Sequence, residues 1–240
     1  MAEVKRLFTC GDSFMSVDAA PAQVTSFLEL FARYRGYHHV TLARPGATNY
    51  LIRLQIDYAI KHRADFVIVS CTSSDRFDVP TSVDRTNRPD LQIVDTPYRG
   101  YRAASEEIVT STDNFFISDT IYNLEHDKNG PCITPDQKTA LKYAVSELHN
   151  PTLQRHKDFY IIRDGLSQLT HHGIPFVFLP AAMNMFDWSQ FKIIWPTDIM
   201  EPYDLVNKQP YDYDITVTHN DQPHHTSFCQ TLLDITPDWV

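Results

Sequence analysis

The sequence predicts an α/β protein in which a parallel β-sheet lies between two layers of helices. Residues 64–72 (ADFVIVSCT) form a continuous apolar and β-branched run, which suits a strand of a parallel sheet covered on both faces. Strand-like and helix-like segments alternate from residue 5 to residue 72. This alternation favours parallel strands joined by right-handed crossover helices.

The individual elements follow from periodicity and end signals. Apolar residues from Val24 to Tyr34 recur at helical spacing before Gly36, a common helix stop. Thr134 and Pro135 have the chemistry of an N-cap and a first helical position. We expect strands over 5–10, 38–46, 64–72 and 174–181, and helices over 21–37, 48–63, 134–149, 151–171 and 224–235.

Residues 76–135 interrupt this alternation. Their periodicity is weak, and a segment of this length is too long for an ordinary loop. Because it leaves the predicted sheet just after the third strand, we expect an insertion that forms a lid or a substrate-selecting wall. A partner-binding surface is the alternative. The 240 residues are expected to fold as one domain over 1–240. The insertion contains Pro80, Pro89, Pro97, Pro131 and Pro135.

The composition argues against several kinds of partner and location. The formal net charge is −9 and no basic stripe is present, so nucleic acid is not expected as a partner. The N-terminus has no signal-peptide pattern and no apolar run reaches the length of a membrane span, which together predict a cytoplasmic protein. Cys10, Cys71, Cys132 and Cys229 lack zinc-site spacing. We expect reduced thiols, with Cys10 and Cys71 buried rather than joined in a disulfide.

A Gly-Asp-Ser tripeptide follows the first predicted strand. Such a tripeptide is common in turns, so it does not identify a nucleophile by itself. In a parallel sheet, however, all strand-to-helix turns lie along one edge, where ligands bind. Ser13, Gly46 and Ser74 follow the first three predicted strands, so we expect them to meet at that edge.

A serine nucleophile also needs a base and an acid that orients the base. Asp221 and His224 lie three residues apart just before the last predicted helix, where one side chain can hydrogen-bond to the other. His225 is the competing base, and His219 is a candidate for a supporting contact. The alternative interpretation is a surface turn with solvated histidines.

Taken together, these segments resemble the SGNH (GDSL-type) hydrolase superfamily, in a divergent subgroup that resembles bacteriophage-encoded members. The resemblance rests on Gly11 to Ser13, on Gly46, and on Asp221 with His224, in the family's order along the chain. Phe14 stands where Leu is usual, and Pro is common at the position after His224. A phage-encoded member would act in the host cytoplasm.

The resemblance implies the SGNH hydrolase fold, a three-layer α/β/α sandwich with a flavodoxin-like sheet, and hydrolysis of an ester or thioester through an acyl-enzyme. It implies Ser13 as the nucleophile, His224 as the base and Asp221 as the orienting acid, with backbone N–H groups of Ser13 and Gly46 in the oxyanion hole. No metal or organic cofactor is implied, and the expected partner is a small-molecule, glycan or lipid ester. Most large apolar residues of 183–196 are expected in the core, although Met185 or Trp188 could line an acyl pocket.

One family block departs from the pattern. The family has Gly-x-Asn-Asp after the third strand, whereas this sequence has Thr72 and Ser74 at the Gly and Asn positions. We expect the Ser74 hydroxyl to be a modest oxyanion donor, with Asn49 as the next candidate. Asn49 and Arg76 could also contact the substrate, although pairing of Arg76 with its acidic neighbours is the preferred interpretation. The departure leaves open an inactive binding or structural module with this fold, and a transferase that uses the same serine.

Overall fold

The centre of the molecule is a four-stranded, all-parallel sheet with the strand order β2-β1-β3-β6. The computed structural model describes residues 4–12, 15, 25–43, 47–74, 76–80, 116–120, 135–180, 183, 185–191 and 222–236. No helix among these residues is both long and apolar enough to cross a membrane. The four strands are β1 (Arg6–Cys10), β2 (His38–Thr41), β3 (Phe66–Ser70) and β6 (Phe176–Leu179).

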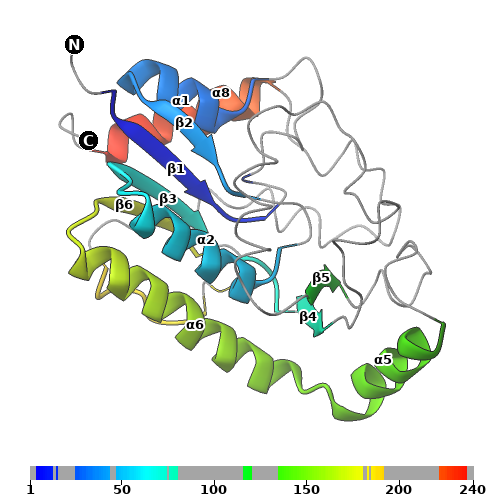
Figure 1. Ribbon diagram of the computed structural model, residues 1–240. Helices are drawn as coiled ribbons and strands as arrows, with labels where there is room; N and C mark the ends of the chain where they lie inside the picture. Colours follow the sequence, from blue (N-terminus) through cyan, green and yellow to red (C-terminus); the bar gives the residue numbers. More distant parts are fainter. Residues whose placement is uncertain are drawn as a thin grey trace.

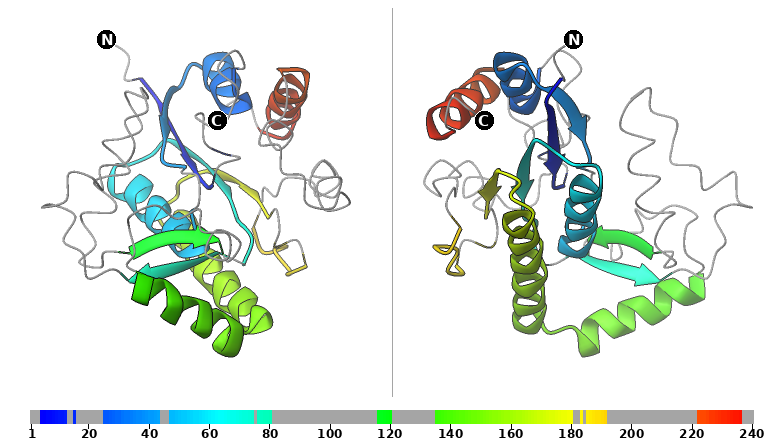
Figure 2. Two further views of the ribbon diagram at one scale, coloured as in Figure 1. Left: turned by 90° about the vertical axis from the view of Figure 1, so that its right-hand side faces the viewer. Right: turned by 60° about the vertical axis from the view of Figure 1, so that its left-hand side comes forward.

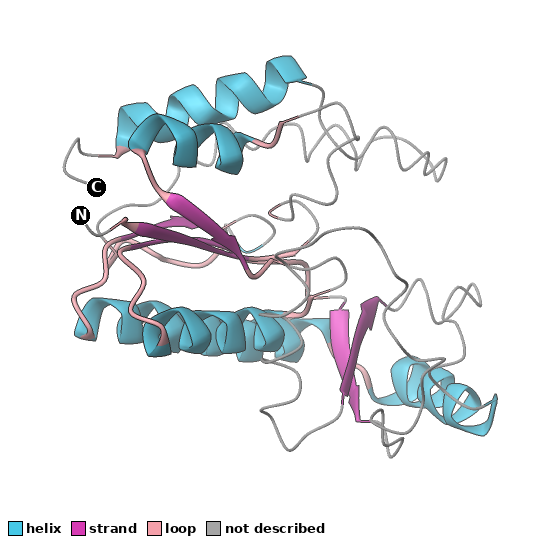
Figure 3. Ribbon diagram, turned by 45° about the horizontal axis from the view of Figure 1, so that its top comes forward, coloured by secondary structure: helices cyan, strands magenta, loops and turns pink. Residues whose placement is uncertain are grey.

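Helices cover both faces of this sheet (Figure 1). One face carries α1 (Phe27–Arg35) and α8 (Gln222–Ile235), and the other carries α2 (Asn49–Lys61) and α6 (Pro151–His171). Figure 3 shows the three layers edge-on. The predicted α/β class, with a three-layer α/β/α sandwich, is therefore confirmed.

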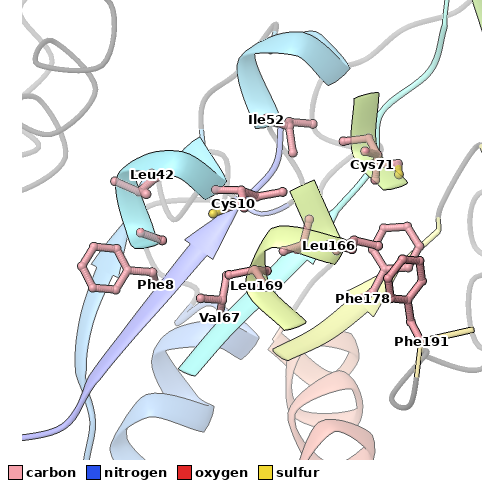
Figure 4. Packing of buried hydrophobic residues seen from close by; sticks show 14 of the residues in the cluster. Phe8, Cys10, Leu42, Ile52, Val67, Cys71, Leu166, Leu169, Phe178 and Phe191 are labelled. Atoms are coloured by element: carbon pink, nitrogen blue, oxygen red, sulfur yellow. The ribbon is translucent and has the colours of Figure 1, made fainter. Parts of the chain in front are cut away.

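The buried strand β3 divides its side chains between two apolar cores. Val67 and Val69 pack with α2 and α6, whereas Phe66 and Ile68 pack with α1 and α8. Successive side chains of a strand point to opposite faces, so a strand covered on both sides needs the continuous apolar run seen here. Figure 4 shows the α2–α6 core, in which Val67 lies next to Leu169.

The aromatic segment after β6 contributes mainly to this same core. Trp188 is buried against Phe178, with ring centroids 4.7 Å apart, and its indole N–H donates to the Met183 carbonyl at 2.9 Å. Met185 is 57% exposed. Trp188 is thus a core residue, as expected for most of this segment.

Helix 21–37 was predicted too long at its start, because α1 begins only at Phe27 and its N-cap Ser26 has extended backbone. Ser26 and Glu29 form a capping box at the start of α1, and Gly36 ends that helix in a left-handed conformation with φ of 70°. The prediction that Tyr34 belongs to the apolar face is wrong, because its side chain is 73% exposed. Tyr37, after the turn, stacks on Phe31 instead, with ring centroids 6.5 Å apart.

The insertion after β3 contains two strands that the sequence did not predict, and the predicted helix over 134–149 follows them. Strands β4 (Arg76–Pro80) and β5 (Phe116–Thr120) pair antiparallel and form a separate two-stranded sheet. The helix that follows is α5 (Pro135–Leu148). Figures 1 and 2 place all three beyond the carboxyl ends of the parallel strands. Strand β4 was not predicted because the periodicity of its residues is weak and because Pro80 is unfavourable in a strand. Residues 81–115 and 121–134 of the insertion lie outside the described residues.

Candidate active site

The end of β1 is held in place by a side-chain amide of α2. The backbone N–H of Gly11 donates to Gln55 Oε1 at 2.7 Å, and Gln55 Nε2 donates to the Gly11 carbonyl at 3.3 Å. The amide therefore bonds both backbone groups of one residue, as a neighbouring strand would. Gln55 is buried, so this contact is protected from water.

Gly11 is needed here because the chain folds back closely on itself. A Cβ atom at this position would lie 2.5 Å from Cγ and 2.8 Å from Cβ of Met15. Met15 is buried, and its backbone N–H donates to the Asp12 carbonyl at 3.1 Å. The first residue of the Gly-Asp-Ser motif thus permits a tight turn at the carboxyl edge of the sheet.

Asp12 is the charged centre of this edge and is only 3% exposed. Its Oδ2 accepts a hydrogen bond from Thr72 Oγ1 at 2.7 Å and forms an ion pair with Arg76 Nη2 at 3.0 Å. Arg76 Nη1 also donates to the carbonyl of Ala47 at 3.2 Å. Arg76 therefore pairs with Asp12, which follows β1; its acidic neighbours Asp75 and Asp78, the preferred partners, have no described side chains.

Asn49 joins three elements at the same edge. Its Nδ2 donates to the Thr72 carbonyl at 3.0 Å and to Asp158 Oδ2 at 3.1 Å, and its Oδ1 accepts from the Thr72 N–H at 3.0 Å. Both amide hydrogens are engaged and the residue is 1% exposed. Asn49 thus bridges α2, the end of β3 and α6, which is a buried position rather than a substrate-facing one.

Asp158 of α6 is a second buried carboxylate beside this strand end. It is 3% exposed and accepts from Asn49 Nδ2 at 3.1 Å and from Gln154 Nε2 at 2.8 Å. Burial raises the pKa of Asp158, although the hydrogen bonds from Ser74, Asn49 and Gln154 oppose this effect. Asp158 is therefore a buried acceptor for Asn49 and Gln154, and its pKa also responds to the Ser74 hydroxyl.

Gln55 and Asp158 were missed in the sequence, although a signal was present. Gln55 lies four residues from both Leu51 and Ala59, and Asp158 lies four residues before Ile162. These apolar residues are buried, so each polar residue continues a buried stripe of its helix. A polar residue within such a stripe indicates an internal hydrogen-bond partner.

The cysteines at this edge are poor nucleophiles. Cys10 and Cys71 are free and buried, as predicted, and Figure 4 shows both in the α2–α6 core. Burial raises the pKa of both thiols, and the charges of Asp158 and Asp12 add to the effect at Cys71. Both thiols are therefore protonated at neutral pH, whereas a reactive cysteine needs the thiolate.

The remaining predicted site residues fall partly outside the description. Ser13, Gly46, Asp221 and His219 are not among the described residues, and the His224 side chain is not described either. The backbone of His224 lies in the first turn of α8. The structure therefore describes the contacts of Gly11 and Asp12, the two residues before Ser13. The catalytic triad itself stays a prediction.

His225, the competing base, has a clear place in the structure. It is buried, its Nδ1 accepts from the Phe27 N–H at 3.3 Å, and its ring stacks on Phe27 at 6.0 Å. His225 thus connects α8 to the start of α1. Among the described residues, no cluster of three or more His, Cys, Asp or Glu side chains is arranged to hold a metal ion.

Comparison with known proteins leaves the family unassigned. No family model and no curated protein match the sequence. A solved structure of "a gut microbial diltiazem-metabolizing enzyme" is similar at 12% sequence identity and a TM-score of 0.34. The similarity covers 98% of this chain and 47% of that one, so the chain spans about half the length of this neighbour. So weak a likeness does not indicate a shared activity.

Proposed function

We propose that the protein is a serine hydrolase of the SGNH (GDSL) type that cleaves an ester or thioester. The observation that carries the proposal is the buried support of the two residues before Ser13. Gln55 holds Gly11, while Thr72 and Arg76 hold Asp12. An ordinary surface turn has no need of such contacts, whereas a nucleophile must be placed accurately relative to its base.

The proposed reaction passes through an acyl-enzyme. Ser13 Oγ attacks the carbonyl carbon while His224 takes the serine proton, and His224 then protonates the leaving alcohol or thiol. Water, activated by His224, hydrolyses the acyl-serine and regenerates Ser13. Asp221 orients His224, and the backbone N–H groups of Ser13 and Gly46 bind the oxyanion.

Ser74 is the remaining candidate for a third oxyanion donor, a role that rests on the sequence pattern. Its side chain is half-buried after β3, and its hydroxyl lowers the pKa of Asp158, which burial raises. The proposal relies on the two backbone donors, which need no side-chain rotation.

An inactive binding or structural module of the same fold is the second candidate. The departure at Thr72 and Ser74 favours it, because loss of one oxyanion donor typically lowers turnover by roughly 10²–10³-fold. A transferase that uses Ser13 differs from the hydrolase only in the acceptor of the acyl group.

Labelling with a fluorophosphonate, followed by mass spectrometry of the labelled peptide, tests the proposal. We expect labelling at Ser13, hydrolysis within a panel of p-nitrophenyl esters of rising chain length, and loss of both in Ser13→Ala. Ser73→Ala is the matched control, because Ser73 is an exposed serine near the same edge. Absence of labelling, with equal ester hydrolysis by Ser13→Ala, would establish the inactive module. Acyl transfer to an added alcohol in preference to water would identify the transferase.

A further inference from the structure

Arg76 connects two turns that the proposed reaction needs. Its Nη2 forms an ion pair with Asp12 Oδ2 at 3.0 Å, and its Nη1 donates to the Ala47 carbonyl at 3.2 Å. In the chain, Asp12 directly precedes Ser13, and Ala47 directly follows Gly46. One guanidinium therefore links the turn after β1 to the turn between β2 and α2, which carry the two proposed backbone oxyanion donors.

The Asp12 side of this link is held by further contacts. Thr72 Oγ1 donates to the Asp12 carboxylate at 2.7 Å, and the Asp12 carbonyl accepts from the Met15 N–H at 3.1 Å. That carbonyl belongs to the peptide unit that also carries the Ser13 N–H. Because a peptide unit is planar, contacts that fix Asp12 also restrict the direction of this donor.

The Ala47 side of the link is anchored at the start of α2. Ala47 is fully buried, and Thr48, the next residue, is the N-cap of the helix and accepts from the Leu51 N–H at 3.1 Å. A guanidinium suits a link between two such partners, because its donors lie in one rigid plane and point in set directions. Arg76 thus joins a turn held from β3 to a turn held by α2.

We propose that Arg76 is a positioning residue, which sets the spacing between these two turns and so places the Ser13 and Gly46 N–H groups for the oxyanion. This inference rests on the proposed function. Both terminal nitrogens of Arg76 contact the protein, which favours this role over the substrate contact that the sequence also allowed. Arg76 is the first residue of β4, so a shift of the insertion at this strand would reach the oxyanion hole.

Steady-state kinetics of Arg76→Lys tests the inference. Lysine keeps a positive charge beside Asp12, but its single ammonium nitrogen cannot reproduce the planar fork. We expect kcat per folded molecule to fall by about tenfold or more while KM changes by less than about twofold, because a misplaced oxyanion donor weakens binding of the transition state rather than of the ester. Arg53→Lys is the matched control: Arg53 also bonds two partners, Asp57 and Asp164, but links α2 to α6, so kcat should stay unchanged.

Other roles of Arg76 predict different results. A purely structural role lowers the free energy of unfolding of Arg76→Lys and leaves the kcat of the folded molecules unchanged. A role of the positive charge alone also leaves kcat unchanged. A contact with the substrate raises KM instead, most strongly for a p-nitrophenyl ester with a carboxylate on its acyl chain, so such an ester is compared with a neutral one. Unchanged kcat, or an effect confined to KM, overturns the inference.

Asp12→Asn tests the same link from its other side. It removes the charge that pairs with Arg76 but keeps an oxygen that can accept from Thr72. Combined with Arg76→Lys, it should lower kcat no further than the larger single loss, since both changes break one connection. A combined loss equal to the product of the single losses overturns the inference.

If Arg76→Lys does not fold, Asp12→Asn alone decides. Its kcat should fall by about tenfold with little change in KM, and an unchanged kcat overturns the inference. Fluorophosphonate labelling of wild-type Ser13 separates the two levels of the argument. Labelling at Ser13 together with unchanged kcat in Arg76→Lys overturns this inference alone, whereas absence of labelling overturns the proposed function and this inference with it.

Discussion

Two side-chain amides of α2 extend the sheet beyond the ends of its strands. Gln55 bonds both the N–H and the carbonyl of Gly11 after β1, and Asn49 bonds both groups of Thr72 after β3. These backbone groups are buried, where a missing partner costs roughly 1–3 kcal/mol. The amides thus fix the backbone at two points of the proposed active site.

Replacing the Gln55 amide by a carboxylate tests this arrangement. Gln55→Glu keeps an acceptor for the Gly11 N–H but loses the donor to the Gly11 carbonyl. We expect the free energy of unfolding to fall by about 1–3 kcal/mol and Ser13 labelling to slow. Urea unfolding and labelling kinetics measure the two effects. Gln190→Glu is the control, because Gln190 is exposed and its amide oxygen, which accepts from Arg163 at 3.3 Å, is kept as a carboxylate oxygen. This change should alter stability by less than about 0.5 kcal/mol.

His39 makes stability depend on pH. Its Nε2 lies 3.0 Å from Thr9 Oγ1, and burial, with a smaller effect from the charge of His38, lowers the pKa of His39 to about 4. The folded protein therefore binds this proton less readily than the unfolded chain. The contribution is fully present above pH ~6.5 and is lost as the pH falls towards 4, by up to about 3 kcal/mol.

Urea unfolding of the wild type and His39→Gln at pH 7 and pH 4.5 checks this prediction. The loss of stability between the two pH values should be smaller in His39→Gln. His171→Gln serves as the control, because His171 is exposed at the end of α6 and should leave the pH dependence unchanged. Equal losses in the wild type and His39→Gln would contradict the assignment.

At the scale of elements, α8 is attached to α1 near both of its ends. His225 accepts from the N–H of Phe27, one of the first N–H groups of α1, which have no acceptor within their own helix. At the other end, Arg35 donates to the carbonyls of Leu233 and Thr236. Because His224 precedes His225, the first attachment also fixes the part of α8 that carries the proposed base.

Substituting His225 and Arg35 in turn distinguishes an effect on stability from an effect on the reactivity of Ser13. His225→Phe keeps a ring against Phe27 but removes the acceptor, which should lower the free energy of unfolding by about 1–2 kcal/mol and slow Ser13 labelling. Arg35→Met removes the distant attachment and should destabilise the protein without slowing the labelling. Chemical denaturation and labelling rates of both variants distinguish the effects. Equal labelling rates in the two variants would show that His225 has no special relation to the base.

The sequence predicted helices well where an apolar stripe and end signals coincided. Helix α6 has its predicted bounds, with Asn150 as N-cap and Pro151 in the first turn. Strand 38–46 was predicted too long because Leu42 and Ala43 are buried like strand residues, although both donate to the carbonyl of Thr9 beyond the ladder. An apolar residue indicates that a position is buried. Whether that position pairs in a sheet depends on strands that are distant in the sequence.

Of the candidate site, the sequence predicted which edge of the sheet should carry it. Topology placed Ser13 and Ser74 on one edge, because the ends of parallel strands must share an edge. The partners of Asn49 and of Arg76 were not predictable, since Asp158 is 109 residues from Asn49 along the chain and Asp12 is 64 from Arg76. Only the folded helices and strands bring these side chains into contact.

At the scale of the whole molecule, the insertion lies on the side of the sheet where the proposed reaction takes place. Figures 1 and 3 show β4, β5 and α5 beyond the carboxyl ends of the parallel strands. Arg76 belongs both to β4 and to the ion pair with Asp12, so the insertion begins at the site itself. This continuity favours a substrate-selecting wall over a remote partner-binding surface.

The pairing of β4 with β5 allows a sharp test of this role. Pro80 lies opposite Phe116 in the antiparallel pair, so the two ends of residues 81–115 are neighbours in space. A two-residue Asn-Gly turn can join such ends. Replacing 81–115 by Asn-Gly should therefore leave the main sheet folded, with a melting temperature changed by less than about 5 °C.

If residues 81–115 select the substrate, this replacement should change the ratio of kcat/KM between long and short p-nitrophenyl esters by tenfold or more. A difference of that size corresponds to the gain or loss of a contact with about one methylene group. A second variant, with a Gly/Ser segment of the original length in place of 81–115, separates the effect of side chains from that of opening the site. Both variants should lose selectivity if the side chains matter, and only the short one should if bulk alone excludes the longer esters. An unchanged ratio in both variants would contradict the wall and favour partner binding, because a surface for another protein has no reason to distinguish esters by length.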